Sequence, residues 1–278
     1  MTQAINAMTV DVEDYFHVSA FEENITRADW ASLELRVERN TYRLLELFEQ
    51  YNVKSTFFTL GWVAERYPQL INRIISEGHE LACHGYEHIR VTEQTPDQFR
   101  TDIIRTKKIL EDLGGKEILG YRAASYSINT ENLWAHDILA EEGFKYSSSV
   151  YPVKHDLYGI PDAPRFSYQP IKGSDFLEIP ISTIKFGQKN IPCGGGGFFR
   201  FYPYMFSKWA FHHINSSNQS AIFYCHPWEI DPKQPRQEGL NFKTKFRHYL
   251  NLHKMEQRIS CLLTDFNWDT MENVFLTK

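Results

Sequence analysis

Short apolar runs alternate with segments of helical periodicity along the first half of the chain. The runs are rich in β-branched and aromatic residues, which predicts strands at 7–12, 54–60, 79–83, 118–121 and 144–146. Apolar residues recur at helical spacing between these runs, which predicts helices at 39–51, 68–77, 96–113 and 130–142. This β-α-β-α order predicts a parallel sheet with helices as crossover connections.

The regular alternation ends near residue 150. Residues 151–200 are rich in Pro and Gly, and short strands are predicted there at 177–179 and 183–186. A helix at 203–215, a strand at 221–225 and a last helix near 242–264 follow. The irregular section is too long for a simple connector, so we expect it to shape a substrate cleft.

Ionisable residues follow several of the apolar runs directly. They are Asp11, Glu13 and Asp14 at the end of the first run, His84 and His88 after the third, Arg122 after the fourth, and His226 after the run at 221–225. In an α/β barrel the active site is built at the edge where the strands end. The sequence therefore predicts a single site that brings these side chains together.

His84 and His88 lie four residues apart and, with Glu13 or Asp14, form a candidate metal site. Two imidazoles and one carboxylate suit Zn²⁺, and also Fe, Co, Ni or Mn, and leave positions open for water and substrate. A His pair at this spacing also arises by chance on helices, but this pair follows an apolar strand. Cys83 and Cys225 precede site histidines on strands, so we expect their thiols to pack outward rather than bind metal.

Asp11 and His226 are candidates for proton transfer. A carboxylate beside a metal-bound water can act as general base, and an imidazole across the site can protonate a leaving amine. The alternative for Asp11 is a cap on the turn after the first strand, and the alternative for His226 is a structural role. Three acids within four positions, followed by Tyr15 and Phe16, favour a functional role for Asp11.

The glycine run at 194–197 lacks the Gly-Lys-Ser/Thr continuation of a phosphate-binding loop. Glycine permits close approach of the backbone to a ligand, so the run is interpreted as a wall of the cleft with Arg200 reaching the substrate. A flexible loop is the alternative. Among the remaining histidines, His155 is a candidate substrate contact.

The composition narrows the classes of partner. A formal net charge of −5 and the lack of a dense Lys/Arg run argue against a nucleic-acid surface. The sequence contains neither an 18-residue apolar stretch nor the features of a secretory signal, so we expect no membrane span and a cytoplasmic location. The four Cys show no paired spacing, which predicts reduced thiols. The 15% aromatic content indicates an aromatic core, or rings that line a carbohydrate groove.

These residues resemble the motifs of the polysaccharide deacetylase (NodB-homology) superfamily, carbohydrate esterase family 4, over most of residues 5–230. The segment Asp11-Val-Glu-Asp14 resembles the first motif, which implies that Asp11 is the base, Glu13 the metal ligand and Asp14 the alternative ligand. The segment His84-Gly-Tyr-Glu-His88 resembles the metal motif His-x-x-x-His. In the family this motif usually has a Ser or Thr at the second position, and that side chain helps to hold the loop. Gly85 stands there in this sequence.

The segment Gly-Tyr-Arg122-Ala-Ala-Ser125 resembles the third motif of the same family. This resemblance implies that Arg122 orients Asp11, and that a backbone N–H near Ser125 contributes to an oxyanion hole.

Two segments in the second half of the chain resemble the fourth and fifth motifs of the family. Ser147 stands where Asp is commoner in the family, and that Asp normally tunes the catalytic His. Glu229, Asp231 and Asp265 are the candidates to replace it. His226-Pro-Trp228-Glu resembles the fifth motif, which implies that His226 is the general acid, and Trp228 is a candidate substrate contact.

Three segments resemble deacetylases associated with bacterial exopolysaccharide and exosortase loci. They are the opening that begins at Asp11, the Gly-Gly-Gly-Phe-Phe-Arg segment and the tail Arg-His-Tyr-Leu-Asn-Leu. The resemblance implies an α/β fold, a distorted seven-stranded (β/α) barrel. It implies one domain over 1–278, with a subgroup-specific extension from about 190 to 278.

The activity implied by the resemblance is metal-dependent removal of the N-acetyl group of an N-acetylhexosamine. The substrate would be a bacterial exopolysaccharide or its lipid-linked precursor, Zn²⁺ would be the favoured metal, and acetate would be released. The alternatives are hydrolysis of another C–N bond, as in a peptidoglycan deacetylase or cyclic amidase, and a catalytically inactive carbohydrate-binding module. Assembly into a homo-oligomer is left open.

Overall fold

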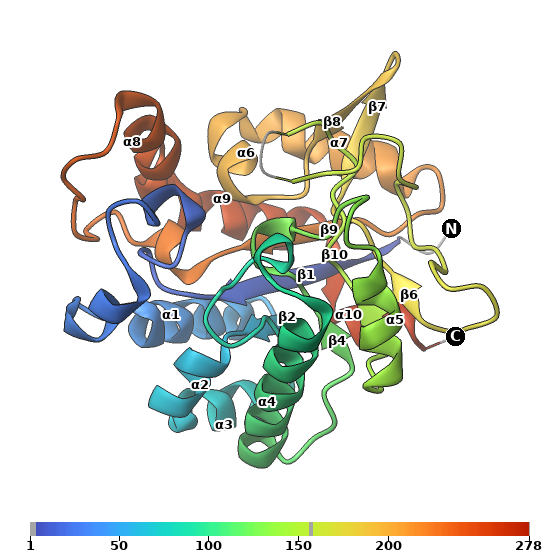
Figure 1. Ribbon diagram of the computed structural model, residues 1–278. Coiled ribbons are helices and arrows are strands. Elements are labelled where there is room, and N and C mark those ends of the chain that lie inside the picture. Colours follow the sequence, from blue (N-terminus) through green and yellow to red (C-terminus); the bar gives the residue numbers. More distant parts are fainter. Residues whose placement is uncertain (1–3, 156–157, 278) are drawn as a thin grey trace.

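The centre of the protein is a sheet of parallel strands (Figure 1), seen here in a computed structural model that describes residues 4–155 and 158–277. Among these residues the sheet has eight strands. They are β1 (Ile5–Val12), β2 (Thr56–Thr59), β3 (Glu80–Cys83), β4 (Gly120–Tyr121), β5 (Tyr146–Ser147), β6 (Leu177–Glu178), β9 (Ile222–Cys225) and β10 (Asn267–Asp269).

Strand β1 is the hub of the sheet. The strand order is β10-β1-β2-β3-β4-β5-β6, and β9 also pairs with β1. Thr9–Val12 of β1 pair with β2, while Ala7–Val10 pair with β9, and every pairing in this sheet is parallel. Strands β1–β6 and β9 are the seven strands of the predicted distorted (β/α) barrel, which is confirmed, and β10 is an addition that pairs with the start of β1.

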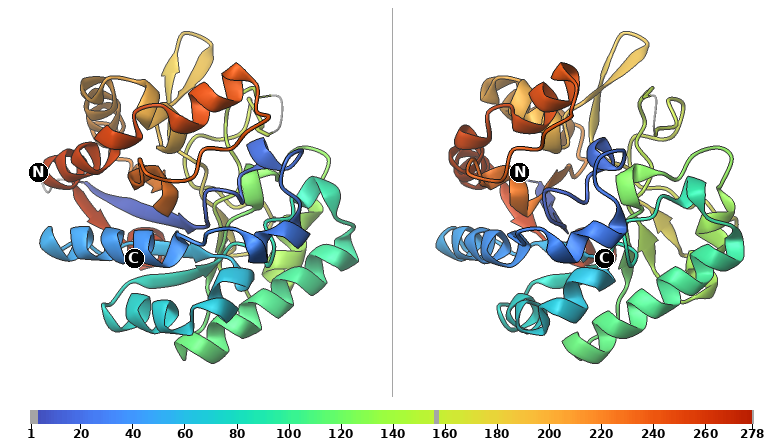
Figure 2. Two further views of the ribbon diagram at one scale, coloured as in Figure 1. Left: turned by 90° about the vertical axis from the view of Figure 1, so that its left-hand side faces the viewer. Right: turned by 60° about the vertical axis from the view of Figure 1, so that its left-hand side comes forward.

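Helices surround the sheet (Figures 1 and 2). Those of the first half are α1 (Val37–Gln50), α2 (Gly61–Arg66), α3 (Pro68–Ser76), α4 (Pro96–Gly114) and α5 (Trp134–Glu141). Those of the second half are α6 (Gly196–Phe201), α7 (Tyr204–Asn215), α8 (Phe242–Tyr249), α9 (Leu252–Asp265) and α10 (Met271–Phe275). No helix of the described residues combines the length and apolar character that crossing a membrane requires.

The helix α4 shows why the predicted helices of the first half are found close to their expected bounds. Thr95 caps its N-terminus in a reciprocal pair with Gln98, and Pro96 takes the first helical position. Gly115 ends the helix in the left-handed conformation, at φ +64°. Each of these signals is local, so the sequence alone contains it.

Two predictions for the second half are corrected. The predicted helix at 242–264 is two helices, α8 and α9, because Asn251 between them takes a left-handed φ of +53°. The predicted strand at 183–186 is found as β7 (Thr183–Phe186), but it pairs antiparallel with β8 (Lys189–Pro192) in a separate hairpin. This hairpin projects from the top of the molecule in Figure 1.

The glycine run at 194–197 is not a flexible loop, since Gly195 packs against a neighbouring strand and the last glycine of the run, Gly197, lines a cavity. Gly195 lies beside Tyr224 of β9, and a Cβ added there would come within 2.0 Å of the Tyr224 carbonyl oxygen. Its backbone angles, φ +138° and ψ −155°, fall in a region that essentially only glycine adopts. The close approach is therefore between two backbone segments, and it sets where α6 begins.

We expect Gly195→Ala to lower the free energy of unfolding by roughly 3 kcal/mol or more, because a forbidden backbone conformation and a backbone clash act together. Urea unfolding measures this loss. Gly115→Ala is the matched control, since Gly115 also has a positive φ but has nothing within 4 Å of an added Cβ. Equal losses in the two variants would contradict the packing role of Gly195.

Candidate functional site

The predicted site residues gather around one small cavity at the edge where the strands end. The cavity has a volume of about 100 Å³. It is lined by Asp11, Glu13, Val18, Ser19, His84, His88, Ala123, Ser125, Tyr126 and His226. Six predicted site residues are in this lining: Asp11, Glu13, His84, His88, Ser125 and His226. Their grouping agrees with the expectation that the strand ends form a single site.

Glu13, His84 and His88 form a group able to hold a metal ion. One ligand atom from each lies within 4.8 Å of the others, and all three residues are buried. Glu13 Oε2 lies 3.0 Å from His88 Nε2, yet it has no hydrogen-bond donor among the described residues. A buried carboxylate oxygen without a donor is costly unless a cation meets it, so the residues fit a divalent metal.

The protonation states of this group also suit metal binding. His84 Nδ1 lies 2.8 Å from the carbonyl oxygen of Arg122, so Nδ1 carries the proton that it donates and Nε2 is left for a metal. Burial lowers the pKa of His84 to about 4, which keeps the imidazole neutral. Burial raises the pKa of Glu13, but the combined effect of His88, His226 and His84 holds that pKa well below its ordinary value.

The loop from His84 to His88 is held from outside the motif. Gly85 has a φ of +76°, and its carbonyl accepts a hydrogen bond from the N–H of Gly61 at the start of α2. The carboxylate of Asp102 in α4 accepts the N–H of Tyr86 at 3.2 Å. Asp102 and α2 thus supply support that the family more commonly obtains from a Ser or Thr at position 85.

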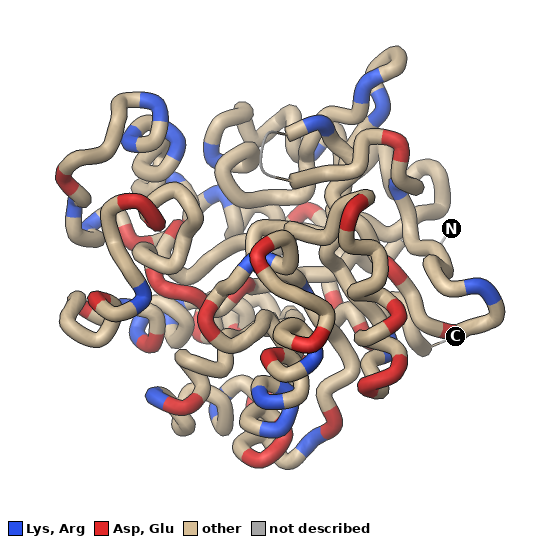
Figure 3. The backbone as a smooth tube through the Cα atoms, in the orientation of Figure 1, with Lys and Arg blue, Asp and Glu red and all other residues tan. Residues whose placement is uncertain are grey.

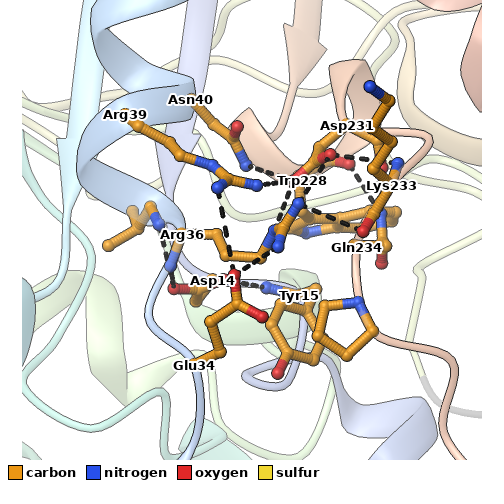
Figure 4. A network of polar contacts seen from close by, with 12 residues as sticks. Asp14, Tyr15, Glu34, Arg36, Arg39, Asn40, Trp228, Asp231, Lys233 and Gln234 are labelled. Carbon is orange, nitrogen blue, oxygen red and sulfur yellow. Dashed lines mark hydrogen bonds and ion pairs between the residues drawn. The ribbon is translucent and has the colours of Figure 1, made fainter.

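Asp14, the alternative metal carboxylate, lies outside this group. Its Oδ2 accepts the N–H groups of Arg36 and Val37 at 2.6 and 2.9 Å, at the start of α1 (Figure 4). Its Oδ1 accepts the N–H of Tyr15 at 2.9 Å. The prediction of Asp14 as a ligand is therefore corrected, because its oxygens are committed to a helix N-terminus, which prefers a carboxylate.

Arg122 holds the side chain of Asp11 in the cavity lining. Arg122 Nη1 donates to Asp11 Oδ1 at 2.5 Å, and both side chains are buried. The same nitrogen also donates to Thr9 Oγ1 at 2.9 Å, and Nη2 donates to Ser148 Oγ at 3.1 Å. This arrangement leaves Asp11 Oδ2 as the oxygen that faces the remaining site residues.

Ser125 and Tyr126 form a strained turn at the edge of the cavity. Both have positive φ values, +53° and +52°, which are uncommon for residues other than glycine. Ser125 Oγ lies 2.7 Å from Ser19 Oγ, and the Tyr126 hydroxyl donates to Asp11 Oδ2 at 3.4 Å. Tyr126 is a further residue of the site that was not predicted, and its place directly after Ser125 is the one local signal for it.

His226 faces both carboxylates of the site. Its Nε2 lies 3.6 Å from Glu13 Oε1 and 3.9 Å from Asp11 Oδ2. Its Nδ1 lies 3.0 Å from Glu229 Oε2. Burial alone would lower the pKa of His226, but the hydrogen bond to Glu229 and the nearby carboxylates raise it to about 9.

Glu229 is the carboxylate that orients His226. The alternatives are engaged elsewhere, since Asp231 pairs with Arg36 at 2.6 Å and Asp265 with Lys208 at 2.8 Å. Ser147 itself donates to Ser149 Oγ at 2.7 Å. Glu229 therefore takes the place that the family more commonly gives to an Asp at position 147.

The predicted substrate contact of Arg200 is corrected. Arg200 is 2% exposed, and its Nε donates to Glu229 Oε1 at 2.6 Å. Its Nη1 donates to the carbonyl oxygens of His248 and Leu250 at 2.8 and 2.9 Å. Arg200 thus lies behind Glu229, where its charge and that of His226 outweigh the effect of burial and lower the pKa of Glu229 to about 2.

Trp228 is also buried rather than exposed to substrate. Its ring stacks between His226, at 5.1 Å, and His248, at 4.3 Å between ring centroids. Its Nε1 donates to Glu13 Oε1 at 3.4 Å. The predicted substrate role is corrected: Trp228 positions the imidazole and the carboxylate from behind.

Cys83 and Cys225 behave as expected from their place on the strands. Both are buried among apolar side chains, and burial raises the pKa of each thiol well above its ordinary value. Neither belongs to the group of ligand atoms found among the described residues.

Comparisons with known proteins match two segments of the chain. Residues 29–146 match the family described as Polysaccharide deacetylase, and residues 148–276 match a domain of unknown function, DUF3473. A peptidoglycan-N-acetylglucosamine deacetylase from Bacillus cereus is 41% identical over 75 residues, which are 27% of this chain and 27% of that protein. The matched part thus covers about a quarter of that relative's length.

Solved structures show the same fold over nearly the whole chain. A Mycobacterium smegmatis protein assigned as a polysaccharide deacetylase superposes with a TM-score of 0.61 at 20% identity, covering 98% of this chain and 88% of that one. The allantoinase Puue gives the same TM-score at 15% identity, with 98% and 88% coverage. At these identities the likeness is one of fold.

Zinc titration of variants at Glu13 and Asp14 tests which of these two carboxylates is a metal ligand. We expect Glu13→Gln to weaken zinc binding by more than about 100-fold, because a ligand is lost outright. Asp14→Asn is the matched control, which should bind zinc with unchanged stoichiometry but unfold with about 1–2 kcal/mol less free energy. Competition with a chelator and urea unfolding measure the two effects. Zinc loss in Asp14→Asn alone would reverse the assignment.

Proposed function

We propose that the protein removes N-acetyl groups from a glycan. The chain belongs to the polysaccharide deacetylase family and carries a C-terminal DUF3473 segment. The bond cleaved is the amide C–N bond of an N-acetylhexosamine, and acetate is released. One observation carries the proposal: the Glu13, His84 and His88 group faces Asp11 and His226 across a single cavity.

A divalent metal is the cofactor of this reaction. Neutral imidazoles and a carboxylate favour zinc, while Co, Ni, Fe and Mn accept the same ligands. Held by Glu13, His84 and His88, the metal would polarise the acetamide carbonyl and lower the pKa of water. The remaining chemistry belongs to side chains of the protein.

Asp11 is the general base. Its Oδ1 is fixed by Arg122, so Oδ2 is the oxygen that takes the proton from the attacking water. The hydroxyl of Tyr126, 3.4 Å from Oδ2, helps to set its direction. Ser125 lines the same cavity, and a backbone N–H at this position would stabilise the negative charge that develops on the carbonyl oxygen.

His226 is the general acid. Its Nδ1 side is held by Glu229, which leaves Nε2 facing Glu13 and Asp11. A protonated imidazole there donates its proton to the departing nitrogen, which would otherwise leave as a poor, strongly basic amide anion. The buried Arg200 keeps Glu229 ionised and in place, so the DUF3473 segment completes the catalytic group.

The glycan is proposed to be a bacterial exopolysaccharide or its lipid-linked precursor. Support comes from the resemblance of three sequence segments to deacetylases of exopolysaccharide loci. Peptidoglycan, the substrate named for the Bacillus cereus relative, is the alternative glycan. The cytoplasmic location stays a prediction.

Two other functions remain as alternatives. A cyclic amidase has the support of a fold that the allantoinase Puue shares. An inactive binding module has the support of Ser147, but Glu229 compensates for that change at His226. The intact group of Glu13, His84 and His88 favours the hydrolase.

Acetate release from N-acetylglucosamine oligomers, by metal-stripped protein with and without added zinc, tests the proposed function. We expect acetate only with metal. A protein that binds stoichiometric metal and releases no acetate from these or from exopolysaccharide oligomers would contradict the proposal.

We expect Asp11→Asn to lower the turnover number by at least about 10²-fold, because the base is removed while its shape is kept. Zinc stoichiometry measured on the same sample should be unchanged, since Asp11 is outside the ligand group. Turnover at the wild-type rate would exclude Asp11 as the base.

Glu229→Gln tests what orients His226. We expect a loss of roughly 10- to 100-fold in turnover, because an amide orients the imidazole less well and does not stabilise its charge. Asp265→Asn is the control, since Asp265 contacts Tyr204 and Lys208 instead, and it should turn over normally. Equal turnover in the two variants would remove Glu229 from the catalytic group.

A further inference from the structure

A second and larger cavity, which we call the α8 cavity, lies next to the catalytic one. Its volume of about 410 Å³ falls in the range of roughly 300–1,000 Å³ found for ligand-binding pockets. It is lined by His155, Tyr158, Gly197, Phe198, Phe201, Tyr202, Tyr224, Lys243, Phe246, Arg247 and Leu250. All of these residues fall within the segment that matches DUF3473.

Three tyrosine rings form the wall between the two cavities. Tyr126 lines the catalytic cavity, while Tyr158 and Tyr224 line the α8 cavity. The Tyr126 ring lies 5.1 Å from that of Tyr224 and 6.3 Å from that of Tyr158, between centroids. The two cavities are therefore neighbours, separated by aromatic side chains that contact one another directly.

Aromatic rings dominate the lining of the α8 cavity. Phe198 and Tyr202 are stacked at 6.2 Å, with an angle of 21° between their planes. Phe201 is 57% exposed and Phe246 is 46% exposed, so these large rings are not committed to the core. Exposed aromatic faces around a pocket offer stacking surfaces for the apolar faces of sugar rings.

The charge of the lining is positive. Lys243 and Arg247 are one helical turn apart on α8, and the lining contains no Asp or Glu. Within residues 4–155 and 158–277, no carboxylate forms an ion pair with either side chain. The whole chain is acidic, at −5, yet Figure 3 shows blue positions gathered on α8 at the upper left.

We propose that the α8 cavity binds an acidic sugar unit, a uronate, of the same glycan whose N-acetyl group enters the catalytic cavity. This inference rests on the proposed function. The aromatic rings stack on the sugar, and Lys243 and Arg247 pair with its carboxylate. The substrate is thereby a polymer or oligomer in which acidic units accompany N-acetylhexosamine.

Two hexasaccharides that differ only at their carboxyl groups test this proposal. One alternates N-acetylglucosamine with glucuronic acid, and the other is its neutral carboxyl methyl ester. By calorimetry in low salt, we expect the acidic form to bind the zinc-loaded wild-type protein roughly ten-fold more tightly. Equal affinity for the two forms would overturn the proposal.

Variants of α8 residues test whether the difference in affinity between the acid and the ester arises in the α8 cavity. The double variant Lys243→Gln and Arg247→Gln should bind the acid and the ester equally. Lys245→Gln is the matched control, since Lys245 lies on the same helix outside this lining, and it should keep the preference. A preference that survives in the double variant would overturn the assignment.

Acetate release separates this proposal from the proposed function. Acetate release from neutral N-acetylglucosamine oligomers by the zinc-loaded wild-type protein reports on the proposed function alone, since these oligomers carry no carboxylate for Lys243 and Arg247. If no oligomer releases acetate but the charge preference depends on Lys243 and Arg247, the proposed function fails and the binding site stands. If acetate is released but the acid and ester bind equally, the binding site alone fails.

A membrane surface is the competing partner for basic and aromatic residues on one helix. Sedimentation with phosphatidylglycerol vesicles distinguishes it. If the double variant loses vesicle binding while its preference for the acidic hexasaccharide is intact, α8 is a membrane contact and the glycan proposal is wrong.

Discussion

The buried ion pair between Arg122 and Asp11 is the interaction on which the site depends. It joins the end of β1 to the loop after β4, and the same guanidinium reaches Ser148 after β5. The carbonyl oxygen of Arg122 also fixes the tautomer of His84. One residue thus orients the proposed base, Asp11, and a proposed metal ligand, His84, together. A buried ion pair contributes little net stability, since desolvation offsets most of the attraction, so its value lies in position.

The C-terminal half supplies what the first half lacks. His226 directly follows strand β9, and the turn after it returns Glu229 to the imidazole. Arg200 of α6 reaches Glu229 because Gly195 and Gly196 let the preceding backbone lie against Tyr224. The resembled family commonly has this supporting carboxylate at position 147, the last residue of β5, whereas here Glu229 supplies it from the same segment as His226. The glycine run, Arg200 and Glu229 therefore act as one structural unit.

The parts that local patterns determine could be predicted from the sequence. Apolar runs mark the strands, and the strand ends mark Asp11, Glu13, His84 and His226, because parallel strands end at one edge. Long-range partners left no such pattern: Arg200 and Glu229 are 29 residues apart, and Asp14 caps a helix that begins at Val37. A buried arginine and a substrate-binding arginine look alike in a sequence, since only tertiary packing decides which carboxylate or carbonyl the guanidinium meets.

We propose that Glu13, His84 and His88 together hold the metal. X-ray absorption at the zinc edge, on zinc-reconstituted wild-type protein, tests it most directly because it counts ligand types. We expect nitrogen and oxygen neighbours at about 2.0–2.1 Å, with the outer scattering of two imidazole rings. A sulfur neighbour at about 2.3 Å, from Cys83 or Cys225, or a shell without imidazole, would contradict it.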